Sequence, residues 1–239
     1  MSNELVINST QNGCRIALLN DRRLIEFHQE DGGIQFNVGD IYLGTVRKVV
    51  QGLNAGFIDI GYEKDAFLHY LDLGPQVQSL NKFTKLIQSK KEISTKLIGF
   101  RNETDIDKFG KIGQVLTKNQ NVLVQVVKEP ISTKGPRLSC ELSIAGRYLV
   151  LVPFSNAVNV SKKIGNSNER KRLARLISSI KPENFGVIIR TVASGRDVKE
   201  LDTDLQNLVQ IWQRGIEKLK KSKSKDKIIG EVSRTNSIV

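Results

Sequence analysis

Cysteine and histidine are scarce in this sequence, which has two of each among its 239 residues. The cysteines, Cys14 and Cys140, form no CxxC pair. That arrangement excludes a disulfide framework and a cysteine zinc site built within this chain. We interpret both residues as buried thiols of a protein from a reducing cytosol.

Long hydrophobic runs are also absent. No stretch reaches the roughly 18 apolar residues that a membrane-spanning helix needs. The first ten residues lack the basic and then apolar pattern of a secretory signal. We therefore expect a soluble, cytoplasmic protein that has no membrane association.

The motifs of several common enzyme classes are missing. The sequence contains no GxxxxGK[ST] loop, no HExxH, no GxSxG and no group of Cys and His at metal-ligand spacing. A two-metal nuclease needs carboxylates that converge on metal ions about 4 Å apart. Residues two apart on a helix do not face the same way. We expect no catalytic or metal-binding residue here and assign solvated or capping roles to the acidic clusters, Asp59, Glu63 and Asp65, and Asp202 and Asp204.

What the sequence does have is positive charge. It contains 37 Lys and Arg against 25 Asp and Glu, a formal net charge of +12. A surplus of this size suits a polyanionic partner, because neutralised phosphates release counterions. Basic composition also arises from solvated surfaces that bind nothing, so charge alone leaves both interpretations open. Hydrophobic residues make up 39% of the chain, which is enough for a core.

The first half of the chain reads as β-structure with one polar interruption. Residues 1–35 predict a hairpin or a short meander. From Val38 onward, short strands alternate with glycine-containing turns. The segment 74–113 is polar and rich in lysine, and we expect a long flexible loop there with room for one short helix. The strand pattern resumes near residue 121.

The second half mixes strands with helices. Residues 158–189 read as strand, helix, strand. A long amphipathic helix follows over 198–221, and the sequence leaves open whether its apolar face, which includes Trp212, is covered. The run "SKSKDK" has the composition of a linker, and "IIGEVSRTNSIV" reads as the beginning of a further element.

Two phenylalanines could form a nucleic-acid-binding face. An OB-type barrel presents aromatic and basic side chains on one face, where each base that stacks on a ring contributes about 1–3 kcal/mol. Phe57 and Phe67 lie in adjacent expected strands, and Tyr42 lies on the strand before them. Because Phe is usually buried, these residues alone leave open whether both belong to the core. Candidate phosphate contacts are Lys48, Lys64 and Lys134.

A second candidate site follows the expected strand "GVIIRT". There Arg190 and Thr191 place a guanidinium beside a hydroxyl, and Arg can hold a phosphate by two parallel hydrogen bonds. Backbone N–H groups around Gly146 and Val150 could complete such a cradle. On spacing alone, an ordinary surface arginine at a strand end explains the pattern better.

Four strings carry a family resemblance, and they occur in the same order as in that family. They are "LVINSTQNGCRIALL", "GDIYLGTVRKVVQGLNAGFIDIGYEKDAFLHYLDL", "LSIAGRYLVLVP" and "GVIIRTVASG". The chain closely resembles the amino-terminal half of the bacterial ribonuclease E/G family over nearly its whole length. The least similar part is the segment 74–113.

The resemblance implies an α+β fold of several subdomains, in which an OB-type (S1) β-barrel is inserted into a mixed RNase H-like and 5′-sensor framework. Residues 1–38 would be the first segment of the RNase H-like subdomain. Residues 39–127 would be the S1 RNA-binding domain, with a loop insertion near 74–113. Residues 128–215 would be the 5′-sensor region, and 216–239 a linker and the truncated start of the returning RNase H-like segment.

The resemblance also implies roles for individual residues. The sensor of the family recognises a 5′-monophosphate on RNA, and a monophosphorylated end favours cleavage downstream. Positions that match the barrel's RNA contacts are Phe57, Phe67 and Lys134. Positions that match the sensor are Arg190 and Thr191 for the phosphate grip, with Gly146 and Val150 for backbone contacts.

One sensor position departs from the family pattern. Lys162 stands where relatives have an arginine in "SRR". A lysine is a point charge without the planar fork of arginine, so a phosphate or sugar contact at Lys162 would be less directional.

The catalytic half of the family pattern has no match here. In the family, two Asp residues of a DNase I-like subdomain hold Mg²⁺, and a CPxC motif forms a Zn²⁺ link between subunits. We expect both metals only in a carboxy-terminal part beyond this chain, and a homo-oligomer only where that part is present. Alone, the chain is expected to bind single-stranded RNA, with preference for a 5′-monophosphate end, without cutting it.

Other functions remain open at this point. The chain could be a truncated or split gene product of an endoribonuclease involved in RNA processing and mRNA decay. It could instead be a stand-alone, non-catalytic RNA-binding regulator. A structural contact with ribosomes or with a decay complex, and metal binding by the acidic clusters, are weaker alternatives.

Overall fold

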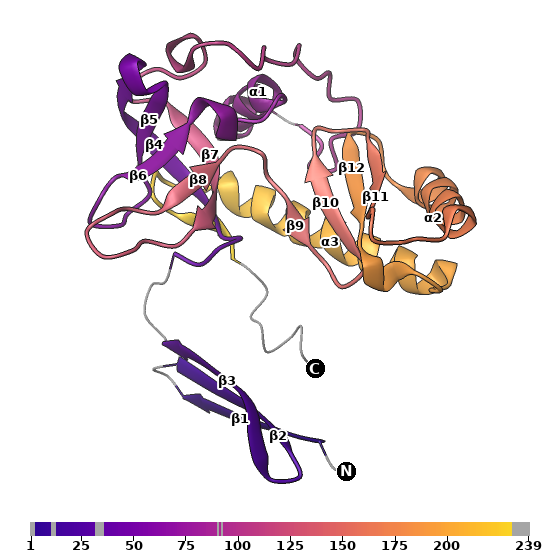
Figure 1. The fold of residues 1–239 in the computed structure, drawn as a ribbon. Coiled ribbons are helices and arrows are strands. Elements are labelled where there is room, and N and C mark those ends of the chain that lie inside the picture. Colours follow the sequence, from indigo (N-terminus) through magenta and orange to yellow (C-terminus); the bar gives the residue numbers. More distant parts are fainter. Residues whose placement is uncertain (1–2, 11–12, 32–35, 90, 92, 231–239) are drawn as a thin grey trace. The chain divides into compact units, whose positions relative to one another are not determined.

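The computed structural model describes residues 3–10, 13–31, 36–89, 91 and 93–230 (Figure 1). The chain divides into two compact units, one built from the amino-terminal strands and the other spanning Val38–Glu231.

The amino-terminal unit is a three-stranded antiparallel meander. Its strands are β1 (Asn3–Thr10), β2 (Gly13–Asn20) and β3 (Arg23–Asp31), paired in the order β1-β2-β3. Asp21 and Arg22 join β2 to β3 with φ angles of 45° and 64°. Two successive residues with positive φ suit the right-handed twist of a tight hairpin. The meander predicted for this segment is thus confirmed.

The larger unit contains a closed barrel of five strands. β4 pairs with both β5 and β7, so the sheet order β4-β5-β6-β8-β7 returns to β4 and leaves no open edge in the ring. This closure is compatible with an OB-type fold. The five strands are β4 (Ile41–Val50), β5 (Ala55–Asp59), β6 (Ala66–His69), β7 (Asn121–Lys128) and β8 (Arg137–Ser139).

Glycine allows β4 to curve around the barrel. A Cβ atom at Gly44 would lie 2.5 Å from the side chain of Ile58 on β5, closer than two carbon atoms can approach. Glycine at such a crossing lets a strand bend tightly while its neighbours fill the interior. Leu43, Val46 and Ile58 are completely buried around this point.

The polar segment between β6 and β7 is packed rather than free. It contains the helix α1 (Val77–Gln88), whose apolar residues recur every three or four positions and include the fully buried Phe83 and Ile87. Beyond the helix, Leu97 is also fully buried, and its carbonyl accepts a hydrogen bond from the Asn184 side chain at 3.0 Å. The predicted short helix is confirmed, but the expectation of a long flexible loop is wrong for this part of the segment.

A second, four-stranded sheet follows the barrel in the same unit. Its order is β11-β12-β10-β9, and β11 and β12 run parallel. Two helices accompany it, and α2 provides the connection between the parallel strands (Figure 1). The elements are β9 (Ile144–Ala145), β10 (Leu149–Pro153), β11 (Val158–Val160), α2 (Ser167–Ile180), β12 (Phe185–Ile189) and α3 (Val198–Leu219).

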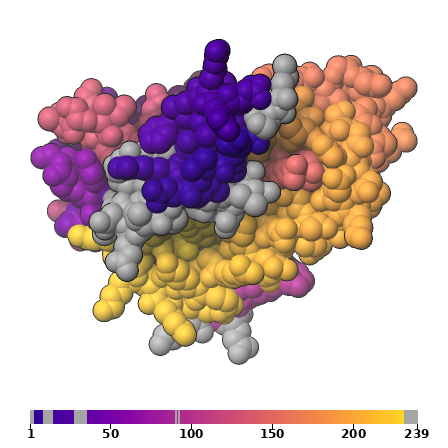
Figure 2. Space-filling view, turned by 90° about the horizontal axis from the view of Figure 1, so that it is seen from below, coloured from indigo at the N-terminus to yellow at the C-terminus, as the bar shows by residue number. Residues whose placement is uncertain are grey.

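The apolar face of α3 is covered. Trp212 is 1% exposed, and its indole N–H donates to the Thr95 carbonyl at 2.9 Å. Its ring lies about 6 Å from the rings of Phe83, Phe154 and Phe185, which come from α1, the end of β10 and β12. The aromatic cluster therefore joins the long helix to α1 and to the second sheet. The outer side of α3 forms one continuous surface with the residues of the second sheet and α2 (Figure 2).

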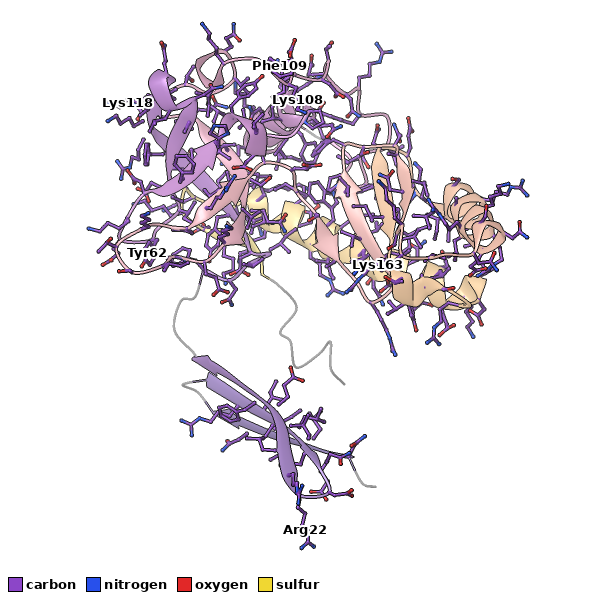
Figure 3. The ribbon with its side chains drawn as sticks, viewed as in Figure 1. Arg22, Tyr62, Lys108, Phe109, Lys118 and Lys163 are labelled. Carbon is purple, nitrogen blue, oxygen red and sulfur yellow. The ribbon has the colours of Figure 1, made fainter. Side chains whose placement is uncertain are left out.

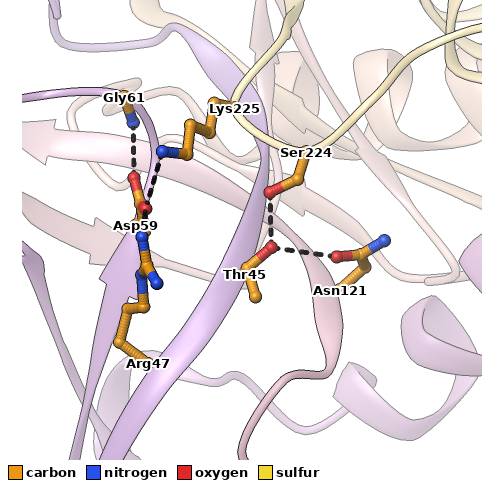
Figure 4. A network of polar contacts seen from close by, with 7 residues as sticks. All are labelled: Thr45, Arg47, Asp59, Gly61, Asn121, Ser224 and Lys225. Atoms are coloured by element: carbon orange, nitrogen blue, oxygen red, sulfur yellow. Dashed lines mark hydrogen bonds and ion pairs between the residues drawn. The ribbon is translucent and has the colours of Figure 1, made fainter.

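The chain returns to the barrel after α3. Strand β13 (Lys227–Ile229) pairs with the start of β4, and the ammonium of Lys227 lies 2.6 Å from the carboxylate of the buried Asp40. Ser224 shares a hydrogen bond with the Thr45 hydroxyl (Figure 4). These bonds make the linker-like run "SKSKDK" an integral part of this unit. The further element predicted at the end of the sequence lies mostly outside the described residues.

Asp59 is the centre of the polar network in Figure 4. Its side chain is 8% exposed and lies 2.5 Å from the Arg47 guanidinium and 3.0 Å from the Lys225 ammonium. The N–H of Gly61 donates to it at 3.0 Å. Burial raises the pKa of Asp59, but the hydrogen bonds from Lys225, Gly61 and Arg47 outweigh it and leave the pKa below its usual value.

We expect Asp59→Asn to lower the free energy of unfolding by about 1–3 kcal/mol at pH 7, because two cations lose their shared carboxylate. Because the pKa of Asp59 is lower in the folded than in the unfolded protein, its charged form stabilises the fold. This stabilisation is complete at pH values above the unfolded pKa of about 3.9, and it is lost as the pH falls through the pKa of the folded protein. Urea unfolding at pH 7 and pH 3 should therefore show a difference between variant and wild type that shrinks in acid. Asp105→Asn, at an exposed position, is the control; a difference independent of pH would contradict the assignment.

Candidate functional site

Phe57 and Phe67 form an aromatic pair on the outer side of the barrel. They stand directly opposite each other on β5 and β6, with ring centroids 5.9 Å apart and planes at 73°. Both side chains are partly exposed, whereas their strand neighbours Ile58, Ala66 and Leu68 are completely buried. The alternation of strand residues between two faces explains this difference. Neither phenylalanine thus belongs to the closed barrel core.

Basic residues flank the pair across the strands. Exposed Lys48 on β4 is the register partner of Phe57, and exposed Arg137 on β8 is the partner of Phe67. Arg137 holds two hydrogen bonds to the Asp72 carboxylate, at 3.0 and 3.1 Å, which fix its orientation. A row of cation, ring, ring and cation therefore crosses four strands. Sequence reasoning missed Arg137, because only the barrel closure places β8 beside β6.

The remaining barrel candidates lie at different depths. Lys64 is exposed in the turn between β5 and β6, and Lys134 is exposed in the short hairpin before β8, where it bridges to Ile131. Tyr42 is only 2% exposed, and its hydroxyl lies 3.4 Å from the Asp40 carboxylate. Burial raises the pKa of Tyr42. Tyr42 is therefore a core residue and no part of the outer face, whereas His69, 6.4 Å from the Phe67 ring, extends that face.

The second candidate site lies at one edge of the four-stranded sheet. The parallel strands β11 and β12 end side by side there, with Val160 opposite Ile189 and the N–H of Ser161 donating to the Ile189 carbonyl at 2.9 Å. Lys162 follows β11 and Arg190 follows β12, and both are exposed. Side chains from parallel strands that end together form a natural ligand site. Figure 3 labels Lys163, the neighbour of Lys162, at this edge.

Arg190 is oriented by the turn between β9 and β10. Its guanidinium donates to the Gly146 carbonyl at 2.5 Å, and its backbone N–H donates to the Tyr148 carbonyl at 2.9 Å. A guanidinium has five N–H donors, so this contact positions the group and leaves it able to bind an anion. Thr191 is exposed and begins a short 3-10 helix, Thr191–Ala193.

Gly146 and Val150 lie in the turn before β10 and in β10 itself. The N–H of Gly146 donates to the Leu149 carbonyl at 2.8 Å within the turn, so Gly146 offers its carbonyl to Arg190 rather than an N–H to a ligand. Val150 lies inside the sheet, opposite Ala145 on one side and Ile188 on the other. Gly146 therefore orients Arg190 through its carbonyl. A contact of Gly146 or Val150 with a phosphate stays a prediction.

The turn itself is held by Asp204 on α3. The Asp204 carboxylate accepts hydrogen bonds from three successive backbone N–H groups, those of Arg147, Tyr148 and Leu149, at 3.1, 2.9 and 2.9 Å. A Cβ atom at Gly146 would lie 2.7 Å from the same carboxylate, which explains why glycine stands there. The solvated or capping role assigned to Asp204 from sequence is wrong.

Sequence spacing did contain a signal for this role. Asp204 lies three residues after Leu201 and four before Leu208, both completely or almost completely buried. Positions three and four apart share one face of a helix. Asp204 therefore faces the protein on the apolar side of α3, whereas Asp202 accepts a hydrogen bond only from Gln206 of the same helix among the bonds described.

A network of charges supports the loop after Arg190. Glu169 on α2 binds Arg172 through both carboxylate oxygens, at 2.7 and 2.8 Å, and accepts the Gly195 N–H at 2.9 Å. Hydrogen bonding from Arg172 lowers the pKa of Glu169 to about 2. Arg172 also donates to the Arg196 carbonyl at 3.0 Å. This loop is thereby tied to α2 at any physiological pH.

Tyr148 contributes to the same region. The guanidinium carbons of Arg147 and Arg196 lie 5.4 and 5.5 Å from the centroid of the Tyr148 ring. The Tyr148 hydroxyl donates to the Glu200 carboxylate at 3.1 Å. Cations over an aromatic face gain about 0.5–1 kcal/mol at exposed sites. The sheet edge is therefore surrounded by ordered positive charge.

The described part of the chain contains neither a metal-ligand cluster nor a membrane-spanning helix. No three side chains of His, Cys, Asp or Glu come together there in a way that could hold a metal ion. Among the same residues, no helix has the length and apolar character needed to cross a membrane.

Comparison with known proteins supports one family. The profile described as the Ribonuclease E/G family matches residues 143–239. The chain is 36% identical to Ribonuclease G of Haemophilus influenzae over 95% of its length, and 32% identical to Ribonuclease G of Escherichia coli K12 over 98%. It is 37% identical over 74% of its length to Ribonuclease E of Nostoc sp.. The chain spans 43%, 44% and 22% of these three relatives, respectively.

Proposed function

We propose that this chain, which belongs to the Ribonuclease E/G family, is the RNA-binding and 5′-end-sensing part of a ribonuclease that acts in RNA processing and decay. The proposal rests on the row of Lys48, Phe57, Phe67 and Arg137 across the barrel. The basic sheet edge around Arg190 belongs to the same compact unit of the chain. The similarity to Ribonuclease G and Ribonuclease E supports RNA as the ligand.

The barrel would bind single-stranded RNA without strong sequence preference. Unpaired bases stack on the exposed edges and faces of Phe57 and Phe67, and every base offers a π-face for this contact. Lys48 and Arg137, with Lys134 from the hairpin before β8, neutralise phosphates on either side. Because such contacts release counterions, affinity should fall steeply as salt is added.

The sheet edge would bind the 5′-monophosphate of the same RNA. Arg190 is held by the Gly146 carbonyl, so its remaining N–H groups can bind two phosphate oxygens without much loss of side-chain entropy. Thr191 can donate its hydroxyl, and Lys162 adds a positive charge from the neighbouring strand end. A 5′-hydroxyl end has no such charge and gains little from these groups.

Cleavage in this family uses metal ions, and the described residues do not fit a metal site. No three potential ligands converge among them, so no step of the cleavage reaction is assigned to this chain's described residues. Their part is to bind the RNA and to fix the position of its 5′ end.

Fluorescence anisotropy with the 239-residue chain tests this function. One short single-stranded RNA, labelled at its 3′ end, is prepared with either a 5′-monophosphate or a 5′-hydroxyl. Tighter binding of the monophosphate form, with no cleavage of the same samples in Mg²⁺, is the expected result. Equal binding of the two RNAs would refute the sensing role. Mg²⁺-dependent cleavage by the pure chain would show that the chain itself contains an active site.

Phe57→Ala is expected to weaken RNA binding by about 1–3 kcal/mol, the contribution of one stacked base. The ratio of affinities for monophosphate and hydroxyl ends should stay unchanged, because the sheet edge is untouched. Anisotropy titrations provide both numbers, and circular dichroism confirms that the variant is folded. Leu53→Ala, an exposed apolar side chain of the same barrel, serves as the control; equal losses in both variants would contradict a stacking role.

A further inference from the structure

An exposed phenylalanine stands on the segment between α1 and β7. Phe109 is 89% exposed, the highest value among the large apolar side chains described as exposed. Single exposed apolar residues are common and need no special explanation. Phe109 differs because the turn that carries it is tightly held, so its exposure is a fixed property of the fold.

Hydrogen bonds within the turn and to the barrel fix its conformation. The N–H of Phe109 donates to the Asp107 carboxylate at 2.7 Å, and the Tyr70 hydroxyl donates to the Asp107 carbonyl at 2.5 Å. The side chain of Asn54 donates to the Gly110 carbonyl at 3.1 Å and accepts a hydrogen bond from the backbone N–H of Ile112 at 2.8 Å. A Cβ atom at Gly110 would lie 2.2 Å from the Tyr70 hydroxyl, so the turn packs directly on the barrel.

The anchors of the turn are the ends of the strands that carry the aromatic pair. Asn54 immediately precedes β5 and Tyr70 immediately follows β6, and the backbone N–H of Tyr70 donates to the Asn54 carbonyl at 2.9 Å. Phe67 and His69 share the outer face of β6. Leu71 lies in the short 3-10 helix that follows the strand, Tyr70–Asp72, and is 61% exposed.

A hollow of about 280 Å³ lies between the residues that follow β6 and the turn, and Leu71 and Lys108 are among its lining residues. Figure 3 labels Lys108 and Phe109 close together on the loop. The remaining lining residues are Tyr70, Gly74, Pro75, Ile106 and Asp107.

Charge decides which partner fits this surface. Lys108 immediately precedes Phe109 and Lys111 lies two residues after it, and both lysines are exposed. An aromatic ring between lysines is the combination that binds single-stranded nucleic acid, by stacking and by phosphate contacts. The row of Lys48, Phe57, Phe67 and Arg137 on the barrel has the same composition, and the turn is bonded to the ends of two strands of that barrel.

We propose that the turn Asp107–Gly110 extends the RNA-binding surface beyond the barrel strands, with Phe109 as an additional stacking platform and Lys108 and Lys111 as phosphate contacts. The proposal rests on RNA binding by the barrel. OB-type barrels cover about 4–16 nucleotides, and Phe57 and Phe67 alone account for only the first few of these. The turn supplies contacts for the nucleotides that follow past His69 and Leu71.

The test compares RNA length. Phe109→Ala and wild type are titrated by anisotropy with unstructured RNAs of about 5 and about 14 nucleotides. The variant should bind the long RNA about five-fold or more weakly and the short RNA normally, whereas Phe57→Ala should weaken both. Phe109→Trp should retain wild-type affinity for the long RNA, because stacking needs only a ring.

Three outcomes would count against the proposal in distinguishable ways. Normal binding of the long RNA by Phe109→Ala, with Phe57→Ala weakened, overturns the extension alone and leaves the turn as a surface for a protein. An equal loss in Ile98→Ala, an exposed residue of the same segment, also overturns it. Failure of wild type to bind either RNA overturns RNA binding by the barrel itself.

Discussion

Arg190→Ala is expected to abolish the preference of this chain for 5′-monophosphorylated RNA. The guanidinium is exposed, is oriented by the Gly146 carbonyl, and stands beside Thr191 and Lys162 at the ends of two parallel strands. Hydrogen bonds to charged groups contribute about 1.5–3 kcal/mol each, and the planar fork of arginine makes two of them to one phosphate. The loss should exceed about 2 kcal/mol, which is roughly thirty-fold in Kd. Anisotropy with matched 5′-monophosphate and 5′-hydroxyl RNAs measures it.

The expected pattern is selective. Affinity for the 5′-hydroxyl RNA should change little, because the barrel face contains no part of this site. Arg190→Lys should keep part of the preference through its charge, and Arg175→Ala, which removes an exposed arginine from α2, should keep all of it. Retention of the full preference in Arg190→Ala would show that the 5′ end binds elsewhere. Equal weakening of both RNAs would show that Arg190 is only one general phosphate contact.

Asp204→Ala is expected to destabilise the protein and to weaken 5′-end recognition together. Its carboxylate holds the N–H groups of Arg147, Tyr148 and Leu149. Without it, three backbone donors lose their acceptor, those of the exposed Arg147 and of the buried Tyr148 and Leu149, at a cost of about 1–3 kcal/mol for each that water does not reach. We expect a loss of about 2–4 kcal/mol in unfolding free energy and a turn that no longer holds Arg190. Urea unfolding and anisotropy measure the two effects.

Two variants separate the positioning role from a general effect on stability. Asp202→Ala changes a carboxylate two residues away on α3 that bonds only within the helix among the described contacts, and it should leave both measurements nearly unchanged. Asp204→Asn has the same size but a weaker acceptor, so it should lose part of the preference while remaining folded at the assay temperature. Full 5′-monophosphate preference in a folded Asp204→Asn and Asp204→Ala would exclude the positioning role.

Several features could be predicted from the sequence because they depend on neighbouring residues. The strand alternation and glycine turns from Val38 onward predicted the barrel strands, and helical spacing predicted α2 and α3. The resemblance placed Phe57, Phe67 and Arg190 at positions that the fold leaves accessible. It could not show what holds them, because their partners lie elsewhere in the chain.

The sequence by itself thus determined the β-rich first half, the helices of the second half and the positive charge, since these follow from local periodicity and composition. The candidate residues came from its family resemblance. Only the tertiary structure decided that α1 is packed, that Tyr42 is buried, that Arg137 stands beside Phe67, and that Asp204 holds the turn which orients Arg190. The physical reason is the same in each case. These contacts join residues distant in sequence, and their energy comes from burial and hydrogen bonding that exist only after the barrel has closed and α3 has packed against both sheets.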